Sequence, residues 1–357
     1  MEKHSLEFLK RLLDTPGPSG FEAAPARVWR EEAEGFAERV WADVSGNSLA
    51  VVNPEGRPRV MLAGHVDEIG LQVTWIDEKG FLFVDEIGGW DAQVLVGQRV
   101  KILGRDGDVP GVIGKKPIHL IKQDDRSKAS KTEDLWVDVG VSSRDEAAKL
   151  GVGVGDPMVL DTRMQRLAGD RVVSRAIDNR IGAYVVLEAL RLLAETPAPA
   201  AATYAVATSQ EEIGYAGGGA RTSAYALEPQ VALVVDVTFS TDVPDIEKKE
   251  VGEHAIGGGP VLSRGSAAHE MVFRRLLAAA EAEGIPYTVQ ASPKATRTDA
   301  DAIYLTRTGV PTGVVSVPNR YMHSPNELVS LADLENAARL IAAFVRGLEA
   351  DADFTPR

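Results

Sequence analysis

The spacing of apolar residues changes character twice along the chain, and the first section has the pattern of helices followed by buried strands. Four leucines recur at helical spacing near the start, namely Leu6, Leu9, Leu12 and Leu13. The sequence "TPGPSG" (15–20) ends the helix that they predict, because Pro and Gly stop helices. A second helix is expected over about residues 22–34. The strands "SLAVVN" and "RVMLAG" follow, and the wholly apolar second one predicts a central position in a sheet.

A second section, residues 70–163, has short apolar runs separated by turn sequences such as "DEKG" and "GRDG". The runs are "LQVTWI", "FLFVDEI", "RVKIL", "DVPGVI", "LWVDVGV" and "PMVLD". Helical periodicity is weak here, so the pattern predicts a small all-β unit. The stretch "KQDDRSKASKTED" (122–134) is nearly all polar, and we expect it to form a mobile loop.

The third section, residues 164–357, returns to alternating helices and strands. Helices are predicted in "NRIGAYVVLEALRLLAE", "HEMVFRRLLAAAEAEG" and "LADLENAARLIAAFVRGLEA", and strands in "TYAVAT", "VALVVDV" and "TGVVSV". The simplest account is an α/β domain formed by residues 1–69 and 164–357, with a β-rich domain, residues 70–163, inserted into it.

Composition narrows the class of protein. The chain has 357 residues and a net charge of −13, which argues against nucleic-acid binding because no basic region can neutralise phosphates. It has no cysteine, so disulfides and thiolate metal sites are excluded. No apolar run approaches the roughly 20 residues that span a bilayer. The N-terminus does not resemble a secretory signal, so we expect a cytoplasmic protein that binds neither nucleic acid nor membranes.

Acidic and histidine residues gather where the apolar strands end. His65 and Asp67 follow the strand "RVMLAG", Glu211 and Glu212 follow "YAVAT", Asp236 lies in "VALVVDVT", His323 follows "TGVVSV", and Asp178 precedes a helix. A single Asp in such a place usually caps a turn, and a single His is usually structural. The repetition favours one ligand site beyond the carboxyl ends of the strands. Histidines and carboxylates without cysteine suit Zn²⁺, Co²⁺ or Mn²⁺.

The adjacent pair Glu211 and Glu212 fits such a metal site. Neighbouring side chains on an extended segment point to opposite sides, so one Glu can bind a metal while the other stays free to carry a proton. A metal-bound water needs a nearby base of this kind. In "HVD", Asp67 stands two residues after His65 and can accept its other N–H, which fixes the imidazole tautomer.

Motifs in order along the whole chain resemble those of the dinuclear-metal aminopeptidases, a family that includes glutamyl and deblocking aminopeptidases and forms tetrahedral dodecamers. These motifs are "TPGPSGFE", "AGHVDEIG", "KPIHL", "AIDNRIG", "SQEEIG", "VDVT", "RTDADAI" and "RYMHSPNELVSLADLE". The resemblance implies a zinc-peptidase-like α/β fold, with a mixed sheet sandwiched by helices and an inserted barrel-like domain. It also implies two divalent ions per subunit, zinc or cobalt, with manganese also suitable.

The resemblance assigns roles to the strand-end residues. His65 and Asp236 would bind the first ion, Glu212 and His323 the second, and Asp178 would bridge the two; Asp67 would orient His65, and Glu211 would be the general base. The peptide bond between Asp178 and Asn179 would be cis. Partners would be peptides with a free N-terminus and further copies of the chain, in a dodecamer built from dimers. The β-rich insert would drive this assembly, and the polar loop 122–134 would reach a neighbouring subunit's active site.

One position departs from the family pattern. Arg297 stands where the family usually has Gly, directly before Thr298 and Asp299, which we expect near the substrate. If Arg297 faces the pocket, it can bind an acidic side chain or a substrate carboxylate; if it faces solvent, as Arg side chains mostly do, it has no such role. We therefore expect a neutral or aliphatic N-terminal residue by default, with an acidic one as the alternative that depends on Arg297.

The predicted reaction is hydrolysis of the first peptide bond by a water held on two metals, with Glu211 as base. A metal-dependent N-acyl amidase that uses the same site stays open as an alternative. Glycoside hydrolysis fits less well, because its carboxyl groups flank one bond about 5–9.5 Å apart and the histidines would have no role. A scaffold that has lost catalysis would be expected to lack a ligand. Two glycine-rich stretches, 214–220 and 256–260, are expected to supply flexible backbone near the site.

Overall fold

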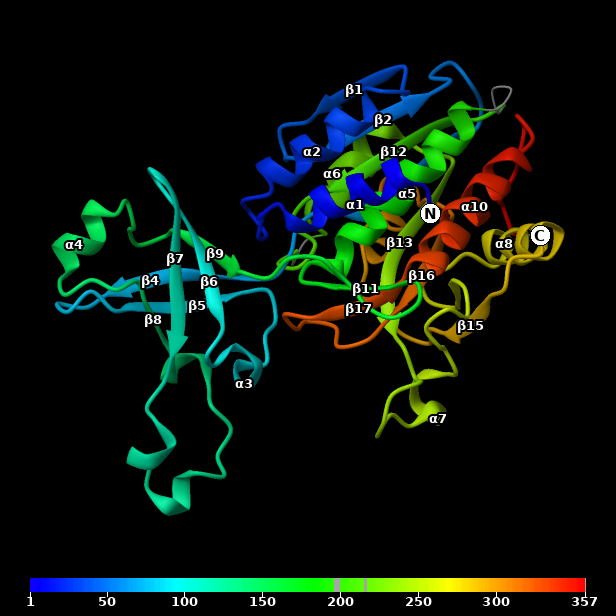
Figure 1. Cartoon of the computed structure of the whole chain (residues 1–357). Helices are drawn as coiled ribbons and strands as arrows, with labels where there is room; N and C mark the ends of the chain where they lie inside the picture. The colour runs from blue at the N-terminus through cyan, green and yellow to red at the C-terminus, as the bar shows by residue number, and fades with distance from the viewer. Residues whose placement is uncertain (196–199, 215–216, 357) are drawn as a thin grey trace.

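The computed structural model of the chain describes residues 1–195, 200–214 and 217–356 (Figure 1). The helices are α1 (Lys3–Asp14), α2 (Ala23–Ala33), α3 (Ala92–Leu95), α4 (Arg144–Lys149), α5 (Ile177–Ala194), α6 (Gly218–Leu227), α7 (Lys248–Val251), α8 (Glu270–Glu283), α9 (Ala300–Ile303) and α10 (Leu331–Arg346). Within these described residues, no helix is long and apolar enough to cross a membrane.

The larger unit is built on a mixed sheet, eight-stranded within the described residues, in the order β1-β2-β12-β3-β13-β16-β14-β15. Its strands are β1 (Arg39–Ala42), β2 (Ser48–Val52), β3 (Arg59–His65), β12 (Ala202–Thr208), β13 (Val231–Phe239), β14 (Val261–Arg264), β15 (Thr288–Ala291) and β16 (Thr312–Asn319). The central strands β12, β3, β13 and β16 run parallel, so their carboxyl ends meet at one edge. The predicted central position of "RVMLAG" is confirmed.

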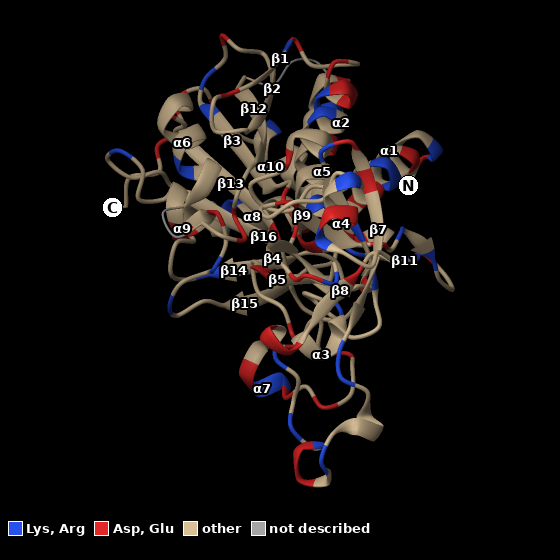
Figure 2. Cartoon of the chain, turned by 90° about the vertical axis from the view of Figure 1, so that its left-hand side faces the viewer, with Lys and Arg blue, Asp and Glu red and all other residues tan. Residues whose placement is uncertain are grey.

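Helices cover both faces of this sheet, as the sequence predicted. Alternate residues of β3 face opposite sides. Val60 and Leu62 pack in one core with residues of α1, α2, α5, α8 and α10. Met61 and Ala63 pack in the other with residues of α6 and α9. In Figure 2, Lys and Arg alternate with Asp and Glu along α1, α2 and the loop below the barrel.

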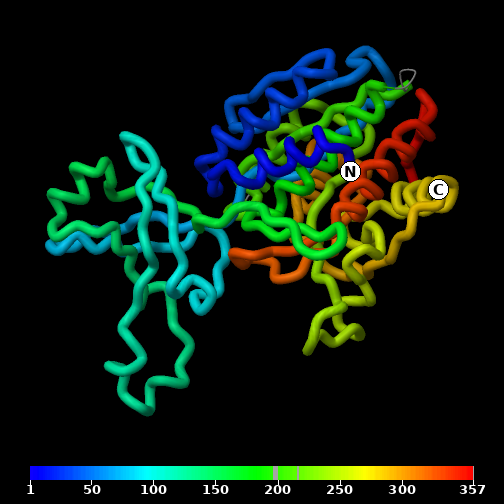
Figure 3. Tube along the Cα trace, in the orientation of Figure 1, coloured from blue at the N-terminus to red at the C-terminus, as the bar shows by residue number. Residues whose placement is uncertain are grey.

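The inserted unit is a closed barrel with its own core, which includes Leu71, Leu82, Ile102 and Val137. Its strands are β4 (Gly70–Ile76), β5 (Leu82–Ile87), β6 (Arg99–Gly104), β7 (Gly107–Gly114), β8 (Trp136–Asp138) and β9 (Pro157–Leu160), in the order β4-β5-β8-β7-β6-β9. The barrel projects to one side of the sheet unit (Figure 3). This confirms the predicted α/β fold with a barrel-like insert.

Three local features were not predicted or fall partly outside the described residues. Helix α4 was not predicted; its N-cap is Ser143, whose side chain accepts a hydrogen bond from the Glu146 N–H. The loop 122–134 has 3₁₀ turns at Gln123–Asp125 and Thr132–Asp134, and Thr132 donates a hydrogen bond to Glu86 of the barrel. The polar loop therefore contains two short turns and one contact with the barrel. Of the glycine-rich stretch 214–220, Tyr215 and Ala216 lie outside the described residues.

A second, small sheet contains β10 (Gln165–Arg166), β11 (Arg171–Ser174) and β17 (Glu327–Ser330). In the sequence, β10 and β11 follow the barrel, and β17 follows β16 of the main sheet. Ser174 of β11 pairs with Glu327 of β17. The chain then enters α5, whose first turn is interrupted by non-helical backbone at Asp178 and Asn179. This small sheet therefore fixes the backbone just before Asp178.

Candidate active site

The predicted site residues meet at the carboxyl edge of the central strands. His65 is the last residue of β3 and pairs in register with Thr208, the last residue of β12. A cavity of about 790 Å³ opens there. Its lining includes every predicted metal ligand and the predicted base: His65, Asp178, Glu211, Glu212, Asp236 and His323. The structure thus brings together side chains that are up to 258 residues apart in the sequence (323 − 65 = 258).

Asp178 lies between the two histidines. Its Oδ1 is 3.3 Å from Nε2 of His65, and its Oδ2 is 3.4 Å from Nε2 of His323. The peptide bond that follows it, Asp178–Asn179, is cis, as predicted. Asn179 donates a hydrogen bond to the Val235 carbonyl at 2.8 Å, which ties this turn to β13. Each oxygen of one carboxylate therefore faces a different imidazole.

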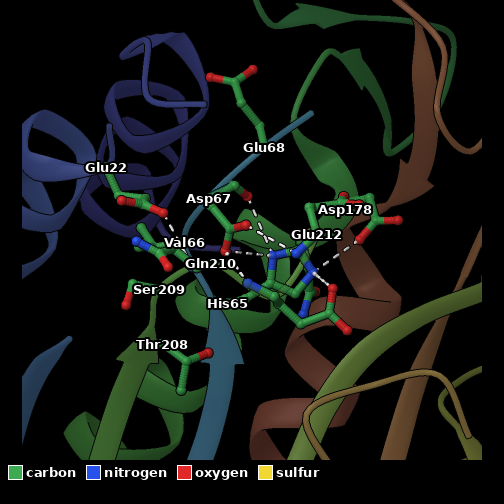
Figure 4. A network of polar contacts seen from close by, with 12 residues as sticks. Glu22, His65, Val66, Asp67, Glu68, Asp178, Thr208, Ser209, Gln210 and Glu212 are labelled. Atoms are coloured by element: carbon green, nitrogen blue, oxygen red, sulfur yellow. Dashed lines mark hydrogen bonds and ion pairs between the residues drawn. The ribbon is translucent and has the colours of Figure 1, made fainter. Parts of the chain in front are cut away.

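The other ring nitrogen of each histidine is held by a different part of the molecule. Nδ1 of His65 lies 3.3 Å from Oδ1 of Asp67, the contact predicted from "HVD" (Figure 4). Nδ1 of His323 lies 2.8 Å from the carbonyl oxygen of Gly89, in the barrel. A proton on each Nδ1 leaves both Nε2 atoms free as ligands, and such partners orient metal-binding histidines.

Two carboxylates hold the turn that carries the adjacent glutamates. Asp67 accepts hydrogen bonds from the backbone N–H groups of Glu211 (3.2 Å) and Glu212 (3.1 Å). Glu22 accepts one from the N–H of Gln210 at 3.1 Å (Figure 4). Glu211 and Glu212 thus lie beyond the end of β12, in a turn rather than on an extended segment, and that part of the prediction is wrong. Gln210 has a φ of +59°, which bends the chain there.

The two glutamate side chains still diverge. Oε2 of Glu211 lies 3.7 Å from Nε2 of His65, and Oε2 of Glu212 lies 3.4 Å from Nε2 of His323. The physical cause is the anchored turn and not strand alternation. Each glutamate therefore belongs to a different half of the cavity.

Asp236 lies inside β13 and not at its end, because the strand continues to Phe239. It is 5% exposed, and its Oδ1 accepts a hydrogen bond from the Val237 N–H at 2.8 Å. Burial and the nearby Asp178 charge raise the pKa of Asp236 well above its usual value. The strand-end prediction is thus corrected for this residue, which still lines the cavity.

The electrostatics of the cavity fit bound cations. Burial raises the pKa of Glu211 to about 10, with His65 opposing the rise and the charges of Asp236, Asp299 and Glu212 adding to it. Ligand atoms of His65, Asp178 and Glu212 all lie within 4.8 Å of one another. Oε1 of Glu212 is buried without a hydrogen-bond partner in the described part of the chain. Crowded carboxylates with an unpaired buried oxygen suit a divalent ion.

Burial alone would lower the pKa values of the two histidines, but their acidic neighbours raise them. Asp67, Asp178 and Glu211 raise the pKa of His65 well above its usual value. Asp178 and Glu212 raise that of His323 to about 11. A bound cation would neutralise the same acidic neighbours that raise these two pKa values.

Sequence reasoning assigned no role to Glu327, although the motif containing it was noticed. Its Oε1 accepts the N–H of His323 at 2.8 Å, and its Oε2 accepts the N–H of Asp178 at 2.9 Å. Glu327 is 2% exposed. An acidic residue in a short apolar strand, "ELVS", was the available indication of a buried partner.

A buried cluster of Glu68, Arg175 and Arg180 lies next to the site, and the sequence did not predict it. Glu68 accepts a hydrogen bond from Arg180 at 2.8 Å and pairs with Arg175. Arg180 is fully buried and donates to the carbonyl oxygens of Val66 (3.0 Å) and Leu12 (3.0 Å). It therefore ties α1 and the segment after His65 to α5, two residues from Asp178.

The three residues of the substrate prediction lie beside the metal-binding cavity. Arg297 is exposed, yet it and Thr298 line both that cavity and a neighbouring one of about 520 Å³. Asp299 lines only the second cavity, is 3% exposed and accepts a hydrogen bond from Thr208 at 2.5 Å. Burial raises the pKa of Asp299 to about 6. Arg297 thus faces solvent and pocket together, and the two alternatives were not exclusive.

Comparisons with known proteins find relatives along nearly the whole chain. A model of the M42 glutamyl aminopeptidase family matches residues 46–340. A lysyl aminopeptidase of Pyrococcus furiosus is 36% identical over 352 residues, covering 98% of this chain and 99% of the relative. The TET aminopeptidase from the marine sediment archaeon Thaumarchaeota archaeon SCGC AB-539-E09 has a TM-score of 0.92 at 36% identity, covering 97% of each chain. PhTET1-12s, a dodecamer, has a TM-score of 0.85 at 30% identity, covering 98% of this chain and 100% of that one.

Proposed function

We propose that this chain, which belongs to the M42 glutamyl aminopeptidase family, removes the first residue from peptides with a free N-terminus by means of two divalent ions. It is a metallo-aminopeptidase, a hydrolase of peptide bonds. The observation that carries the two-ion proposal is the position of Asp178, which presents one oxygen to His65 at 3.3 Å and the other to His323 at 3.4 Å.

The ligands divide into two sets around Asp178. His65 and Asp236 would hold one ion, and Glu212 and His323 the other. Zinc or cobalt suits this set of imidazoles and carboxylates, and manganese also fits. Ions held by these residues would supply Lewis-acid chemistry, polarising the scissile carbonyl and lowering the pKa of a water molecule.

The chain's own groups would then move the protons. Glu211 is free of the proposed ligand set, and its Oε2 faces the cavity near Nε2 of His65. In the metal-free structure its pKa of about 10 keeps it protonated, and nearby cations would lower that pKa so that it can act as a base. Glu211 would take a proton from the attacking water and return it to the leaving amine. Asp67 would hold both His65 and the backbone of Glu211 for this transfer.

Assembly and location belong to the same proposal. We propose domain boundaries at residues 69/70 and 163/164, a dodecamer built from dimers as in the PhTET1-12s structure, and a cytoplasmic location. In that assembly the loop 122–134 would extend from the barrel toward the active site of a neighbouring subunit. Thr298 and Asp299 would lie beside the bound peptide.

Cleavage of paired peptides tests the function. The protein is stripped with chelator, supplied with Zn²⁺, Co²⁺ or Mn²⁺, and given one peptide with a free and one with an acetylated N-terminus. Mass spectrometry should show stepwise loss of single residues from the free peptide only, and only with metal. Removal of the acetyl group instead would show the amidase, and inactivity with every metal would contradict the proposal.

A further inference from the structure

A second cavity adjoins the metal-binding cavity on the side of Glu211. It measures about 520 Å³ and is lined by Glu211, Gly214, Gly217, Arg221, Arg297, Thr298, Asp299, Asp301, Ala302 and Leu305. We call it the arginine cavity. It shares Glu211, Arg297 and Thr298 with the metal-binding cavity, but none of the proposed metal ligands lines it. Glu211 therefore stands at the boundary between the two spaces.

Two guanidinium groups of the arginine cavity are available to a ligand. Arg221 and Arg297 are both exposed, and within residues 1–195, 200–214 and 217–356 neither side chain makes an ion pair or hydrogen bond. Some exposed arginines pair with an acidic residue, as Arg264 does with Glu270 at 3.0 Å, and others such as Arg166 do not pair within the described residues; Arg221 and Arg297 differ from both kinds because they line one cavity together. Two unpaired guanidinium groups in one concave space are suited to a carboxylate, which they bind through charge-assisted hydrogen bonds.

Two acidic residues of the arginine cavity, Asp299 and Asp301, accept hydrogen bonds from the protein, and the third, Glu211, stands at the boundary with the metal-binding cavity. Asp301 accepts hydrogen bonds from the N–H of Thr296 (3.0 Å) and the N–H of Arg297 (2.8 Å) through different oxygens. Asp299 is buried and bonded to Thr208. The accessible charged ends near the opening are therefore those of the arginines.

The backbone at Arg297 is held in one conformation by Asp301. Its φ is +58°, in the left-handed region where glycine is favoured. The Asp301 hydrogen bond to the Arg297 N–H holds the residue in this conformation.

The position of Glu211 determines which part of a substrate enters the arginine cavity. In the proposed function, the first residue and the scissile carbonyl lie among the metal ligands, and Glu211 delivers a proton to the leaving nitrogen. The space beyond Glu211 that contains no metal ligand therefore receives the part of the peptide released by cleavage. In a dipeptide, the C-terminal carboxylate is attached to the carbon that bears this leaving nitrogen.

We propose that Arg221 and Arg297 bind a carboxylate on the leaving side of the scissile bond, so that the enzyme favours dipeptides or peptides with an acidic second residue. The inference rests on the proposed function and deepens it by naming a substrate class. The shared chemistry is a carboxylate close to the leaving nitrogen, and a substrate panel distinguishes its two sources.

The test measures kcat/KM for the metal-loaded enzyme on Ala-Ala, Ala-Ala-amide, Ala-Glu-amide and Ala-Gln-amide. Removing the terminal carboxylate or replacing Glu by Gln should lower kcat/KM about tenfold, the worth of one charge-assisted hydrogen bond. In Arg297→Gly and Arg221→Gln, both ratios should fall toward one. Gly is compatible with the backbone at residue 297, so a lost ratio there does not reflect misfolding. Arg166→Gln, an exposed arginine outside both cavities, should keep the native ratios.

Each outcome has one meaning. If the native enzyme prefers Ala-Ala over Ala-Ala-amide and the arginine variants lose this preference, the bound group is the carboxylate at the end of the chain. If it prefers Ala-Glu-amide over Ala-Gln-amide and the variants lose that preference, the bound group is the side chain of an acidic second residue. Native ratios near one, ratios unchanged in both variants, or a variant-sensitive preference confined to Glu as the first residue would overturn the inference. Failure of the enzyme to cleave any of these substrates with metal would contradict the proposed function instead.

Discussion

The two histidines of the site are held in different ways, although both point Nε2 at Asp178. The side chain of His65 is 2% exposed, and Asp67, two residues away, contacts its Nδ1. The side chain of His323 is 35% exposed, and its Nδ1 contacts the carbonyl of Gly89, 234 residues away in the barrel. One half of the site is therefore local and enclosed, while the other depends on contact between the two units.

This difference suggests a division of labour. The His65 half contains Glu211, which transfers protons in the proposed mechanism and needs a fixed geometry. The His323 half contains Glu212, which is 7% exposed against 18% for Glu211, but its histidine is the more exposed of the two, so we expect the ion there to be easier to lose. We expect the two halves to respond differently to substitution, and the following experiments test that expectation in order of decreasing effect.

Replacing Glu211 with Gln should give the largest effect. The amide keeps the size of the side chain but cannot accept the proton, so kcat should fall by roughly 10²–10⁴-fold. The metal content, measured by plasma mass spectrometry, should stay at two ions per chain because Glu211 is outside the ligand sets. If the variant loses a metal ion as well as its activity, Glu211 is itself a metal ligand. The separation between a base, Glu211, and a ligand, Glu212, would then be wrong.

Replacing Glu212 with Gln should act on metal content first. Its Oε2 lies 3.4 Å from Nε2 of His323, and its other oxygen is buried and unpaired, so a neutral amide removes a charge that only a cation would satisfy. Metal titration should then show one ion bound as in the native protein and one weakened by more than roughly 100-fold. Equal weakening of both ions would contradict independent halves.

Replacing Glu327 with Gln tests the support behind both halves. Its two oxygens each accept one backbone N–H, from His323 and from Asp178, and an amide has only one oxygen for the two donors. One N–H stays unpaired, and the affinity for metal should fall roughly 10–100-fold, which is typical when a residue that hydrogen-bonds to a metal ligand is replaced. Glu349→Gln, at an exposed position, is the matched control and should be neutral.

The sequence predicted the local half of this site better than the remote half. Asp67 could be assigned to His65 because a two-residue spacing determines the contact. Apolar runs followed by acidic and histidine residues favoured one shared site, but the sequence did not place β3, β12, β13 and β16 next to one another. Gly89 and Glu327 could not be assigned, because their contacts with His323 depend on how the barrel and the small sheet pack.

Backbone hydrogen bonds, and not strand geometry, explain why the side chains of Glu211 and Glu212 diverge. Strand alternation seemed to explain why Glu211 and Glu212 diverge, but the positive φ of Gln210 and the two bonds to Asp67 are responsible. A carboxylate that accepts consecutive backbone N–H groups leaves no periodic pattern in a sequence. The prediction that the two glutamate side chains diverge is therefore confirmed, but the cause it gave, the alternation of a strand, is wrong.

The stability of the metal-free protein should fall as the pH rises from about 6.5 to 10. The folded-state pKa values of Glu211 (about 10) and His323 (about 11) lie above their usual values of 4.5 and 6.5. Raised values stabilise the fold below the usual pKa, and that stability is lost as pH rises through the folded pKa. Calorimetry should show a falling Tm, with a smaller fall after Zn²⁺ is added. A flat metal-free profile would contradict the assignment.

Gly88→Ala should give the smallest effect and should separate the halves most cleanly. Gly88 has a φ of +77°, and an added Cβ would lie 2.5 Å from Cγ2 of Ile69, so the segment carrying the Gly89 carbonyl must shift. Gly97→Ala is the matched control: its φ is +81°, and nothing lies within 4 Å of the added Cβ. Both variants should lose stability by about 1–3 kcal/mol from backbone strain.

The two glycine variants should differ in metal binding. Only Gly88→Ala disturbs the partner of His323, so it alone should weaken one ion by a few-fold while the ion at His65 is unaffected. Isothermal titration with Zn²⁺ on both variants measures this directly. If both variants bind two ions as the native protein does, the Gly89 carbonyl does not orient His323, and the open half of the site would then be held by Glu212 and Glu327 alone.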